Sequence, residues 1–291
     1  MQQPLVTVYI ATHNRPEMLR RALRSVYAQT YPHLEIIVVD DGSAPSAEKG
    51  LVNDIAEKKI RFIRNETPEG ACSARNKAIA AATGSYITGL DDDDAFTPGR
   101  IENLINAFRH SPRSLSCVAS CITEQTSAGA ITRQFDSGVV TIDMLRHYNF
   151  LGNQVLTRTE FLQKIGGFDE SLPAFQDYDT WLRLVKQFGP ALKISDPSYI
   201  WYTAHEAQRI SGSSEKRQRA FQAFMSKHSE DMNQQQLNSM ELIRKKVYGQ
   251  PIGYRDAIKL MNRYNRRSVI AQLVNHRAKG LKRLINALRL R

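Results

Sequence analysis

The sequence predicts an α/β fold in which a mixed sheet is flanked by helices and followed by a helical, basic C-terminal region. Three observations predict it. Short apolar runs of strand length alternate with stretches of helical periodicity in the first part of the chain. Polar clusters stand where several of these runs end. After Ser214 the sequence becomes polar, helical in its spacing and rich in Lys and Arg.

The first half reads as alternating strands and helices. A strand over 5–10 is followed by a helix that begins near Pro16, a residue favoured in the first turn. Its apolar stripe consists of Met18, Leu19, Ala22, Leu23 and Val26. The remaining elements are strands over 35–39 and 61–63, an alanine-rich helix over 71–82 and a strand over 85–90. This alternation is typical of right-handed βαβ units, which bind ligands at the carboxyl ends of their strands.

The second half is less regular, and a flexible junction follows it. We expect helices over 100–108 and 179–188 and strands near 115–122, 131–135, 153–158 and 199–202. The Ser- and Gly-rich stretch at 211–214 predicts a junction between a domain over 1–213 and a basic helical region over 214–291.

Composition limits the class of protein. At 291 residues with 42% hydrophobic residues, the chain is long enough for one large α/β domain and an appendage, at the usual ~100 to 200 residues per domain. The cysteines lack the spacing of a zinc site and are predicted to be reduced and buried; they are Cys72, Cys117 and Cys121. No apolar run approaches the ~20 residues that cross a bilayer, so we expect a cytoplasmic protein.

The most informative motif is the run Asp91 to Asp94, directly after the strand over 85–90. Two like charges ~4 Å apart cost about 4 kcal/mol at an effective dielectric of ~20. A divalent cation removes that cost, and oxygen-only ligands suit Mg²⁺ or Mn²⁺ bound together with substrate phosphates. The alternative interpretation is a solvated acidic loop or a helix N-terminus.

Five segments in order resemble inverting glycosyltransferases of family 2 with the Rossmann-like GT-A fold, among them enzymes of bacterial surface-polysaccharide synthesis. They are the segments 8–15, 38–43, 70–76, 90–94, and 166–170 followed by 176–179. The resemblance covers about the first 210 residues. It implies a nucleotide-binding half over 1–98, an acceptor-binding half over 99–213, and transfer of a sugar from a nucleoside diphosphate sugar, usually a uridine diphosphate sugar, to a hydroxyl group.

The resemblance also implies residue roles in donor and metal binding. The donor would be contacted by Thr12, Asn14, Arg15, Asp41, Arg75, Asp91 and Asp92. A Mn²⁺ or Mg²⁺ ion would be held by Asp93 and Asp91, with His205 completing the shell from a loop whose residues 206–214 close over the donor. Simpler roles remain open: a turn residue for Asp41, a surface charge for Arg75, and a surface or capping residue for His205.

Inverting transfer needs a base that takes the proton of the acceptor hydroxyl. The resemblance places Asp177 in this role, although Gln176 stands where the family usually has Glu. Asp179 is the alternative base, but we favour a role for it as a first-turn carboxylate of the following helix. Gly166-Gly167-Phe168 is expected to be a structural turn with Trp181 packed beneath it.

The basic region after residue 213 carries 18 Lys and Arg against 5 Asp and Glu, whereas residues 1–213 carry 22 against 24. Apolar residues with helical spacing from Val269 to Leu288 lie opposite basic ones, which predicts a basic amphipathic helix. We favour peripheral contact with an anionic membrane, on the cytoplasmic face of the inner membrane, over a solvated appendage. Nucleic-acid binding is disfavoured because no zinc-finger or RNA-binding signature accompanies the charge, and an oligomer remains open.

Membrane contact would suit an acceptor glycan carried on a polyprenyl diphosphate lipid. Two other functions remain open at this stage. A nucleotidyltransferase shares the sheet and the acidic site, but it would carry a Gly-rich phosphate loop after the first strand, which Thr12 to Pro16 is not. A non-catalytic adaptor that retains the fold is disfavoured by the presence of Asp91, Asp93 and Asp177.

Overall fold

The computed structural model describes residues 3–51, 60–111, 114–133, 137–203 and 214–274. Contacts divide the chain into two compact units. The first contains the described residues of 3–142, 150–171 and 176–203, and the second those of 143–149, 172–175 and 214–274. Two short segments from the middle of the chain therefore belong with the C-terminal helices, a division that the sequence does not reveal.

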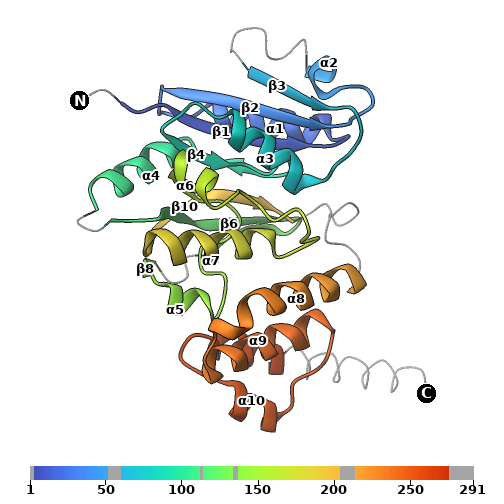
Figure 1. Ribbon diagram of the computed structural model, residues 1–291, viewed down its shortest axis with the longest axis vertical. Coiled ribbons are helices and arrows are strands. Elements are labelled where there is room, and N and C mark those ends of the chain that lie inside the picture. Colours follow the sequence, from blue (N-terminus) through green and yellow to red (C-terminus); the bar gives the residue numbers. More distant parts are fainter. Residues whose placement is uncertain (1–2, 52–59, 112–113, 134–136, 204–213, 275–291) are drawn as a thin grey trace. The chain divides into compact units, whose positions relative to one another are not determined.

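The N-terminal half of the first unit is a parallel sheet with the strand order β3-β2-β1-β4. Its strands are β1 (Val6–Thr12), β2 (Leu34–Asp41), β3 (Ile60–Asn65) and β4 (Tyr86–Gly89). The helices between them are α1 (Pro16–Tyr27), the short α2 (Ala47–Leu51) and α3 (Ala71–Ala81). Figure 1 shows α3 crossing in front of β1 and β2. The strands and helices that the sequence predicts here are present, with bounds shifted by at most two residues.

Apolar periodicity accounts for this half. Helix α1 buries Leu19, Ala22, Leu23 and Val26 in a core that also contains the inward residues of β1 and β2. Strands β1 and β2 are apolar on both faces because helices cover both, as expected for parallel strands. Pro16 occupies the start of α1, where its missing N–H costs no hydrogen bond.

The C-terminal half of the first unit continues the sheet in a mixed pattern, in the order β4-β9-β6-β10-β5, with β7 pairing β6 and β8 pairing β10. The strands are β5 (Ala95–Phe96), β6 (Cys117–Thr126), β7 (Gly129–Arg133), β8 (Gly138–Val140), β9 (Leu156–Arg158) and β10 (Ala191–Tyr202). The helices are α4 (Arg100–Arg109), α6 (Thr159–Lys164) and α7 (Gln176–Phe188).

Several expectations for this half need correction, and the largest concerns the strand predicted near 199–202, which is the end of the longer β10. Helix α7 begins at Gln176, three residues before the predicted start, because Phe175 with φ of 62° makes the sharp turn that leads into it. The strand predicted over 153–158 is shortened to β9, since Gly152 with φ of 80° bends the backbone before it. The earlier start of α7 places Asp177 within the first turn of a helix.

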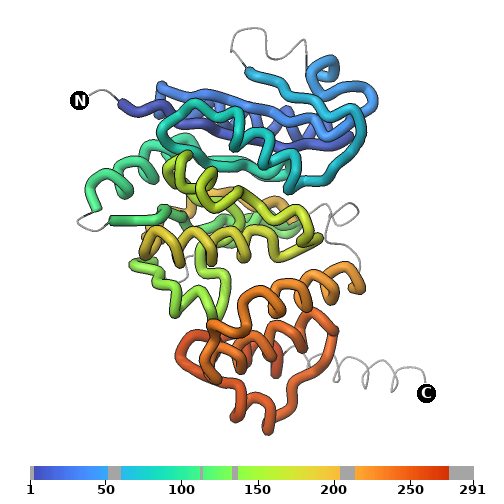
Figure 2. Tube along the Cα trace, viewed as in Figure 1, coloured from blue at the N-terminus to red at the C-terminus, as the bar shows by residue number. Residues whose placement is uncertain are grey.

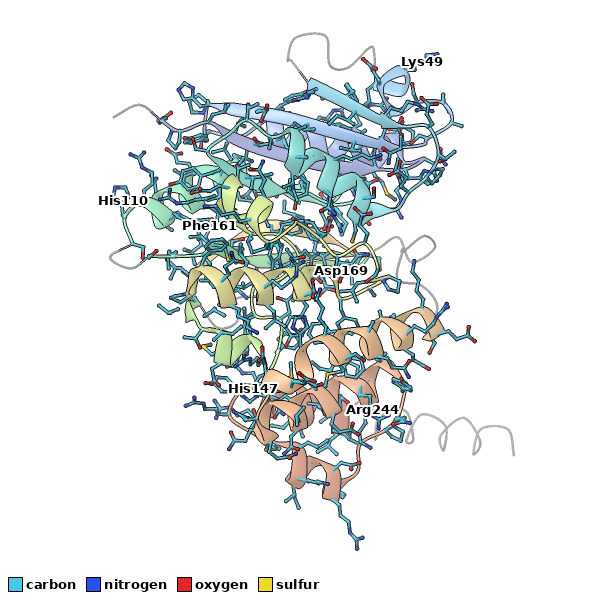
Figure 3. All side chains as sticks on the ribbon, viewed as in Figure 1. Lys49, His110, His147, Phe161, Asp169 and Arg244 are labelled. Atoms are coloured by element: carbon cyan, nitrogen blue, oxygen red, sulfur yellow. The ribbon has the colours of Figure 1, made fainter. Side chains whose placement is uncertain are left out.

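The second unit is helical in its described residues. It contains α8 (Ser214–His228), a short 3₁₀ turn (Ser229–Asp231), α9 (Gln234–Val247) and α10 (Tyr254–Leu260), which Figure 2 draws in orange and red. Along the chain, the first division between the units falls within α5 (Ile142–Leu145). Helix α9 begins at a capping box in which Asn233 and Gln236 exchange hydrogen bonds. Buried Phe221 and Phe224 pack on Phe175, with ring centroids 5.8 and 5.7 Å away.

Two further expectations can be compared with the described residues, and the rest lie outside them. All three cysteines are buried free thiols. No described helix is both long enough and apolar enough to cross a bilayer. Most of the amphipathic helix expected over 269–288, together with His205 and nearly all of the expected lid and junction, lies outside the described residues.

Candidate active site

The acidic run Asp91 to Asp94 lies where β4 ends, at the carboxyl edge of the parallel strands. Gly89, the last residue of β4, allows the strand to lie against two side chains. A Cβ atom there would stand 2.2 Å from Oε1 of Gln154 and 2.5 Å from Cζ of Tyr9. Only glycine fits this position, and the close packing fixes the direction in which the chain enters the acidic run.

Asp91 is held by two side chains from other elements. Its Oδ1 accepts hydrogen bonds from Arg75 Nη2 at 2.9 Å and from Gln154 Nε2 at 3.0 Å. Burial alone would lower the pKa of Arg75, but Asp91 together with the neighbouring Tyr9 and Cys72 outweighs it and leaves that pKa raised, so the guanidinium stays charged. Arg75 therefore neutralises one carboxylate of the run from helix α3.

Asp92 and Asp93 are linked to the end of β1 and the start of α1. Thr12 donates its hydroxyl to Asp92 at 2.8 Å, and Arg15 Nη1 lies 3.2 Å from Asp92 and 3.5 Å from Asp93. Burial raises the pKa of Asp92 to about 6, although Arg15 and Thr12 oppose the shift. The Asp93 side chain keeps 28% of its surface exposed, so it is the member of this pair that faces solvent.

Asp94 anchors the run to the mixed half of the sheet. It is fully buried, accepts the Tyr199 hydroxyl at 2.7 Å and accepts the Tyr202 backbone N–H at 3.1 Å. Burial and the neighbouring carboxylates raise its pKa well above the usual range. Asp94 thus fixes the backbone of the run, whereas Asp93 remains partly accessible.

Asp177 comes close to this site in the first turn of α7. Arg75, which binds Asp91, also donates Nη1 to the Gln176 side chain at 3.2 Å, and so ties the start of α7 to the acidic run. Asp177 is half-buried, and burial raises its pKa to about 6, although the Tyr178 backbone N–H and the charge of Arg75 oppose the shift. A carboxylate with this pKa is ionised at neutral pH and is a stronger base than an ordinary Asp.

Asp41 belongs to a separate cluster at the end of β2. Its two oxygens accept hydrogen bonds from Asn65 Nδ2 at 2.7 Å and from the backbone N–H groups of Glu69 and Gly70, each at 2.8 Å. These bonds shape the loop that leads into α3. Each carboxylate oxygen has further lone pairs, so a ligand N–H remains chemically acceptable at Asp41.

His13 and Asn14 join this cluster to the loop after β1. His13 Nδ1 donates to the Asp41 carbonyl at 2.6 Å, which assigns the proton to Nδ1 and leaves Nε2 to accept from Asn14 at 3.0 Å. Asn14, with φ of 54°, also bonds Ser43 Oγ and the Ala44 N–H, each at 2.8 Å. A pocket of about 320 Å³ lies beside this loop, lined by Thr12, Asn14, Arg15, Pro16, Ser43, Ala44, Pro45, Ser46, Ala47 and Gly50.

The predicted donor residues therefore fall into two groups. Thr12, Arg15 and Arg75 converge on the acidic run, as expected for strand ends that meet at one edge of a sheet. Asp41 and Asn14 belong to the neighbouring cluster. Their hydrogen bonds described above go to residues of that cluster and not to the acidic run.

Other residues of the site were not predicted from the sequence. Gln154 bonds both Asp91 and the Tyr9 hydroxyl, the latter at 3.1 Å, and Tyr199 bonds Asp94. Behind them lies the fully buried Arg100, which donates to the Gln154 carbonyl at 3.4 Å and stacks 5.1 Å from the Tyr199 ring centroid. These residues come from distant parts of the chain, and no local motif marks them.

The expected structural roles near Asp177 are confirmed. Asp179 is buried and forms an ion pair with Arg183 at 2.8 Å within α7, so it is a structural carboxylate. Phe168 packs on Trp181 with ring centroids 5.9 Å apart. Gly167, with φ of 66°, leaves room for Asn76, which lies 2.3 Å from where a Cβ would stand and accepts the Phe168 N–H at 2.8 Å.

The oxygen atoms of the acidic run fit a hard divalent cation better than a soft one. Among the described residues, no group of three or more His, Cys, Asp or Glu side chains has the arrangement of a preformed metal site. A cation bound by carboxylates of this run would therefore have to take further ligands from substrate oxygens and water. That ligand set is typical of Mg²⁺ with a bound phosphate.

Comparison with known proteins places these features in a family. The model of the family described as Glycosyl transferase family 2 matches residues 7–163. The putative colanic acid biosynthesis glycosyl transferase WcaA of Escherichia coli (strain K12) is 33% identical over 218 residues, which cover 73% of this chain and 77% of that protein. Most of the residues that the family model matches lie in the first unit.

Solved structures show the same architecture. TarS of S. aureus in complex with UDP-GlcNAc aligns with a TM-score of 0.64 at 16% identity, over 93% of this chain and 88% of that chain. The mannosyltransferase PcManGT of Pyrobaculum calidifontis, in complex with GDP-Man and Mn²⁺, aligns with a TM-score of 0.62 at 19% identity, over 100% and 82%. At these identities the likeness shows the fold, which is the GT-A fold that the five sequence segments predict.

Proposed function

The chain belongs to glycosyl transferase family 2, and from that premise we propose that it moves a sugar from a nucleoside diphosphate sugar to an acceptor hydroxyl with inversion at the anomeric carbon. The family makes the protein a glycosyltransferase rather than a nucleotidyltransferase or an adaptor. The observation that carries the proposal is Arg75, which binds both Asp91 and Gln176 and so brings the acidic run and Asp177 to one site.

In the proposed reaction, Asp177 takes the proton of the acceptor hydroxyl. The acceptor oxygen forms a bond to the anomeric carbon from the side opposite the diphosphate, and the bond between that carbon and the diphosphate oxygen breaks. The electron pair of the broken bond leaves with the nucleoside diphosphate. Asp177 suits this role because its pKa of about 6 keeps it ionised at neutral pH while it remains basic enough to accept the proton.

The donor, in this proposal, lies along the carboxyl edge of the parallel strands. Asp41 would accept the imide N–H of a uracil base, with Thr12 and Asn14 beside it and Arg15 and Arg75 near the diphosphate. A bound Mg²⁺ or Mn²⁺ would be held by Asp93 and Asp91 and would neutralise charge on the leaving diphosphate. Two fold neighbours with bound nucleotide sugars, one of them with Mn²⁺, support this donor class.

For the acceptor, we propose a glycan or a glycan on a polyprenyl diphosphate lipid, in the synthesis of a bacterial surface polysaccharide at the cytoplasmic face of the inner membrane. The support is the relative whose name assigns it to colanic acid biosynthesis, together with the excess of Lys and Arg after residue 213. His205 would complete the metal shell, although it lies outside the described residues.

A donor panel tests the proposal. Calorimetry with uridine, thymidine and guanosine diphosphate sugars, each with Mn²⁺ or Mg²⁺ and with chelator, should show metal-dependent binding of one nucleotide, and slow hydrolysis of the same donor should follow. Folded protein that binds none of them would contradict the proposal.

Asp177→Asn tests the catalytic role separately. Because the base acts on the acceptor, donor binding should stay within about twofold of wild type while transfer falls by about 10³-fold or more. Glu160→Gln, the same chemical change at an exposed position of α6, serves as the control and should transfer at the wild-type rate. An Asp177→Asn variant that transfers normally would remove Asp177 from the role of base.

A further inference from the structure

The second unit exposes a group of large apolar side chains on α10, on Met261 directly after it, and on the helical residues 266–274. Ile258 is the most exposed, with 82% of its surface accessible. The others are between 43% and 59% exposed; they are Tyr254, Met261, Ile270 and Val274. Of the nine exposed large hydrophobic residues in the described part of the chain, five fall within this stretch.

These side chains are not needed for the core of the unit. The opposite sides of both helical segments are already buried in one small core, formed by Leu242, Ile252, Ala257, Leu260 and Val269 with Leu273 packed against it. Helix α10 is therefore apolar on its buried side and again on its outer side. A second apolar side on a short surface helix indicates a partner, because scattered single residues are the usual pattern on a soluble surface.

Residues 249–291, which include this stretch, carry most of the net charge of the protein. Residues 249–291 contain eleven Lys and Arg against one acidic residue, Asp256, within a chain of net charge +11. Asp256 is already engaged by Lys245 at 3.4 Å and by the Gly253 N–H at 3.2 Å. The described cations among them are all exposed; they are Arg255, Lys259, Arg263, Arg266 and Arg267.

We propose that these five apolar side chains and five cations, here called the basic apolar surface, dock the protein onto an anionic phospholipid surface. Lipid headgroups supply negative charge, and the acyl boundary just beneath them accepts aliphatic and aromatic side chains, so one partner satisfies both features. The absence of a membrane-crossing helix among the described residues is compatible with contact at the surface. Sequence patterning alone assigns this role to a helix over 269–288, whereas the structure adds α10.

Two other partners fit less well. Nucleic acid would pair with the cations, but its phosphates and sugars do not bury aliphatic side chains such as Ile258 and Val274. A second copy of the chain would bury the apolar side chains but would bring two clusters of five cations together. Charge complementarity therefore favours the lipid surface.

Vesicle co-sedimentation of the full chain tests this assignment without any nucleotide, so its result is independent of the sugar transfer. Phosphatidylcholine vesicles are compared with vesicles that contain about one third phosphatidylglycerol, at low and high salt. Wild type should bind the anionic vesicles at least about tenfold more tightly, and salt should reduce that difference.

Paired substitutions separate the two contributions. Ile258→Ser with Ile270→Ser, and separately Arg255→Gln with Lys259→Gln, should each weaken binding to anionic vesicles by about tenfold. The control is Ile131→Ser on β7 of the first unit, where the isoleucine is 50% exposed, and it should bind as wild type does. Thermal unfolding of each variant should match wild type, because all five positions are exposed.

Several results would overturn the proposal. Equal binding to both kinds of vesicle, or wild-type binding by either paired variant, would show that the basic apolar surface does not dock on anionic lipid. A wild-type oligomer that Ile258→Ser with Ile270→Ser dissociates in analytical ultracentrifugation would assign the surface to self-association. Tighter binding of a single-stranded oligonucleotide, unchanged by that apolar pair, would assign the cations to nucleic acid.

Discussion

Two acidic segments lie at equivalent places in the sheet, but the pKa shifts of their carboxylates have opposite directions. Asp40 and Asp41 end β2, and Asp91 to Asp94 follow β4, both at the carboxyl edge of the parallel strands. Burial would raise the pKa of Asp40, but hydrogen bonds from Ser43 and Ala47 and the charge of Arg64 leave that pKa below its usual value. In the other segment, burial raises the pKa values of Asp92 and Asp94.

The two segments differ in which groups donate hydrogen bonds to their carboxylates. Asp40 receives the backbone N–H groups of Ser43 and Ala47, each at 2.9 Å, and Asp41 receives those of Glu69 and Gly70. The β2 pair thereby stabilises two loops, the loop 43–47 and the loop before α3. The β4 run receives side chains from five distant residues and still carries unfavourable charge. Backbone donors therefore stabilise the ionised form of Asp40, whereas Asp92 and Asp94 in the β4 run keep raised pKa values, which fits the cation that we propose for this run.

The largest effect should come from the exposed member of the β4 run. Asp93→Asn removes one of the two carboxylates that we propose to hold a divalent cation, and we expect transfer to fall by about 10³-fold because charge on the leaving diphosphate is then less well neutralised. Stability in urea should stay the same or rise, since a repulsive charge is lost. Calorimetry with Mn²⁺ and nucleotide should show weakened metal binding; a variant with normal metal binding would assign the cation elsewhere.

Asp40→Asn should show the opposite pattern. The amide has one oxygen where the carboxylate has two, so the buried N–H of Ser43 or of Ala47 loses its acceptor. We expect the free energy of unfolding to fall by about 2 to 3 kcal/mol. Urea denaturation at pH 7 measures this change. The folded fraction should still bind donor, because Asp40 faces the loop 43–47. Loss of donor binding without loss of stability would show that Asp40 takes part in donor binding, as we propose for the β4 run.

These contrasts also explain what the sequence predicts and what it does not. The parallel half follows from local signals: apolar runs, Pro16 at a helix start and acidic residues at strand ends. The mixed half depends on pairings between distant strands, such as parallel β6 and β10, whose register shifts between Ile194 and Tyr199. No residue pattern within one strand specifies such a pairing.

The site divides in the same way. Thr12, Arg15 and Arg75 are found from motifs because they follow strand ends or begin helices near them. Gln154 and Tyr199 are polar residues within ordinary sequence, and only the fold brings them to Asp91 and Asp94. Asp41 is predicted from the sequence to bind the donor; the structure adds that its hydrogen bonds organise the loop before α3, and the donor role stays a prediction.

A pH profile should sharpen the comparison further, with an effect of about tenfold. Asp177 has its pKa raised to about 6, so its basic form predominates above pH 6 and is lost as pH falls through that value. At pH 5, kcat/KM should be about tenfold below its plateau at pH 7.5, and it should fall a further tenfold per pH unit. Donor binding measured at both pH values separates this titration from other groups. A flat profile down to pH 5 would exclude a base with this pKa.

The smallest effect should come from Arg64, the charged partner of Asp40. Its side chain is 42% exposed, so solvent screens the ion pair, and Arg64 lowers the pKa of Asp40 less than the hydrogen bonds from Ser43 and Ala47 do. We therefore expect Arg64→Gln to cost only about 0.5 to 1 kcal/mol of unfolding free energy.

The pH dependence of stability distinguishes this explanation from a purely ionic one. Because the folded pKa of Asp40 lies below its ordinary value, its contribution is present at neutral pH and is lost as pH falls below about 4. Arg64→Gln should keep most of this acid-side loss, since the backbone donors remain. Urea melts of wild type and variant at pH 7 and pH 3 measure it. If the variant lost the acid-side dependence, the ion pair would be the main stabilising contact of Asp40, and backbone donors would not be what separates the two acidic segments.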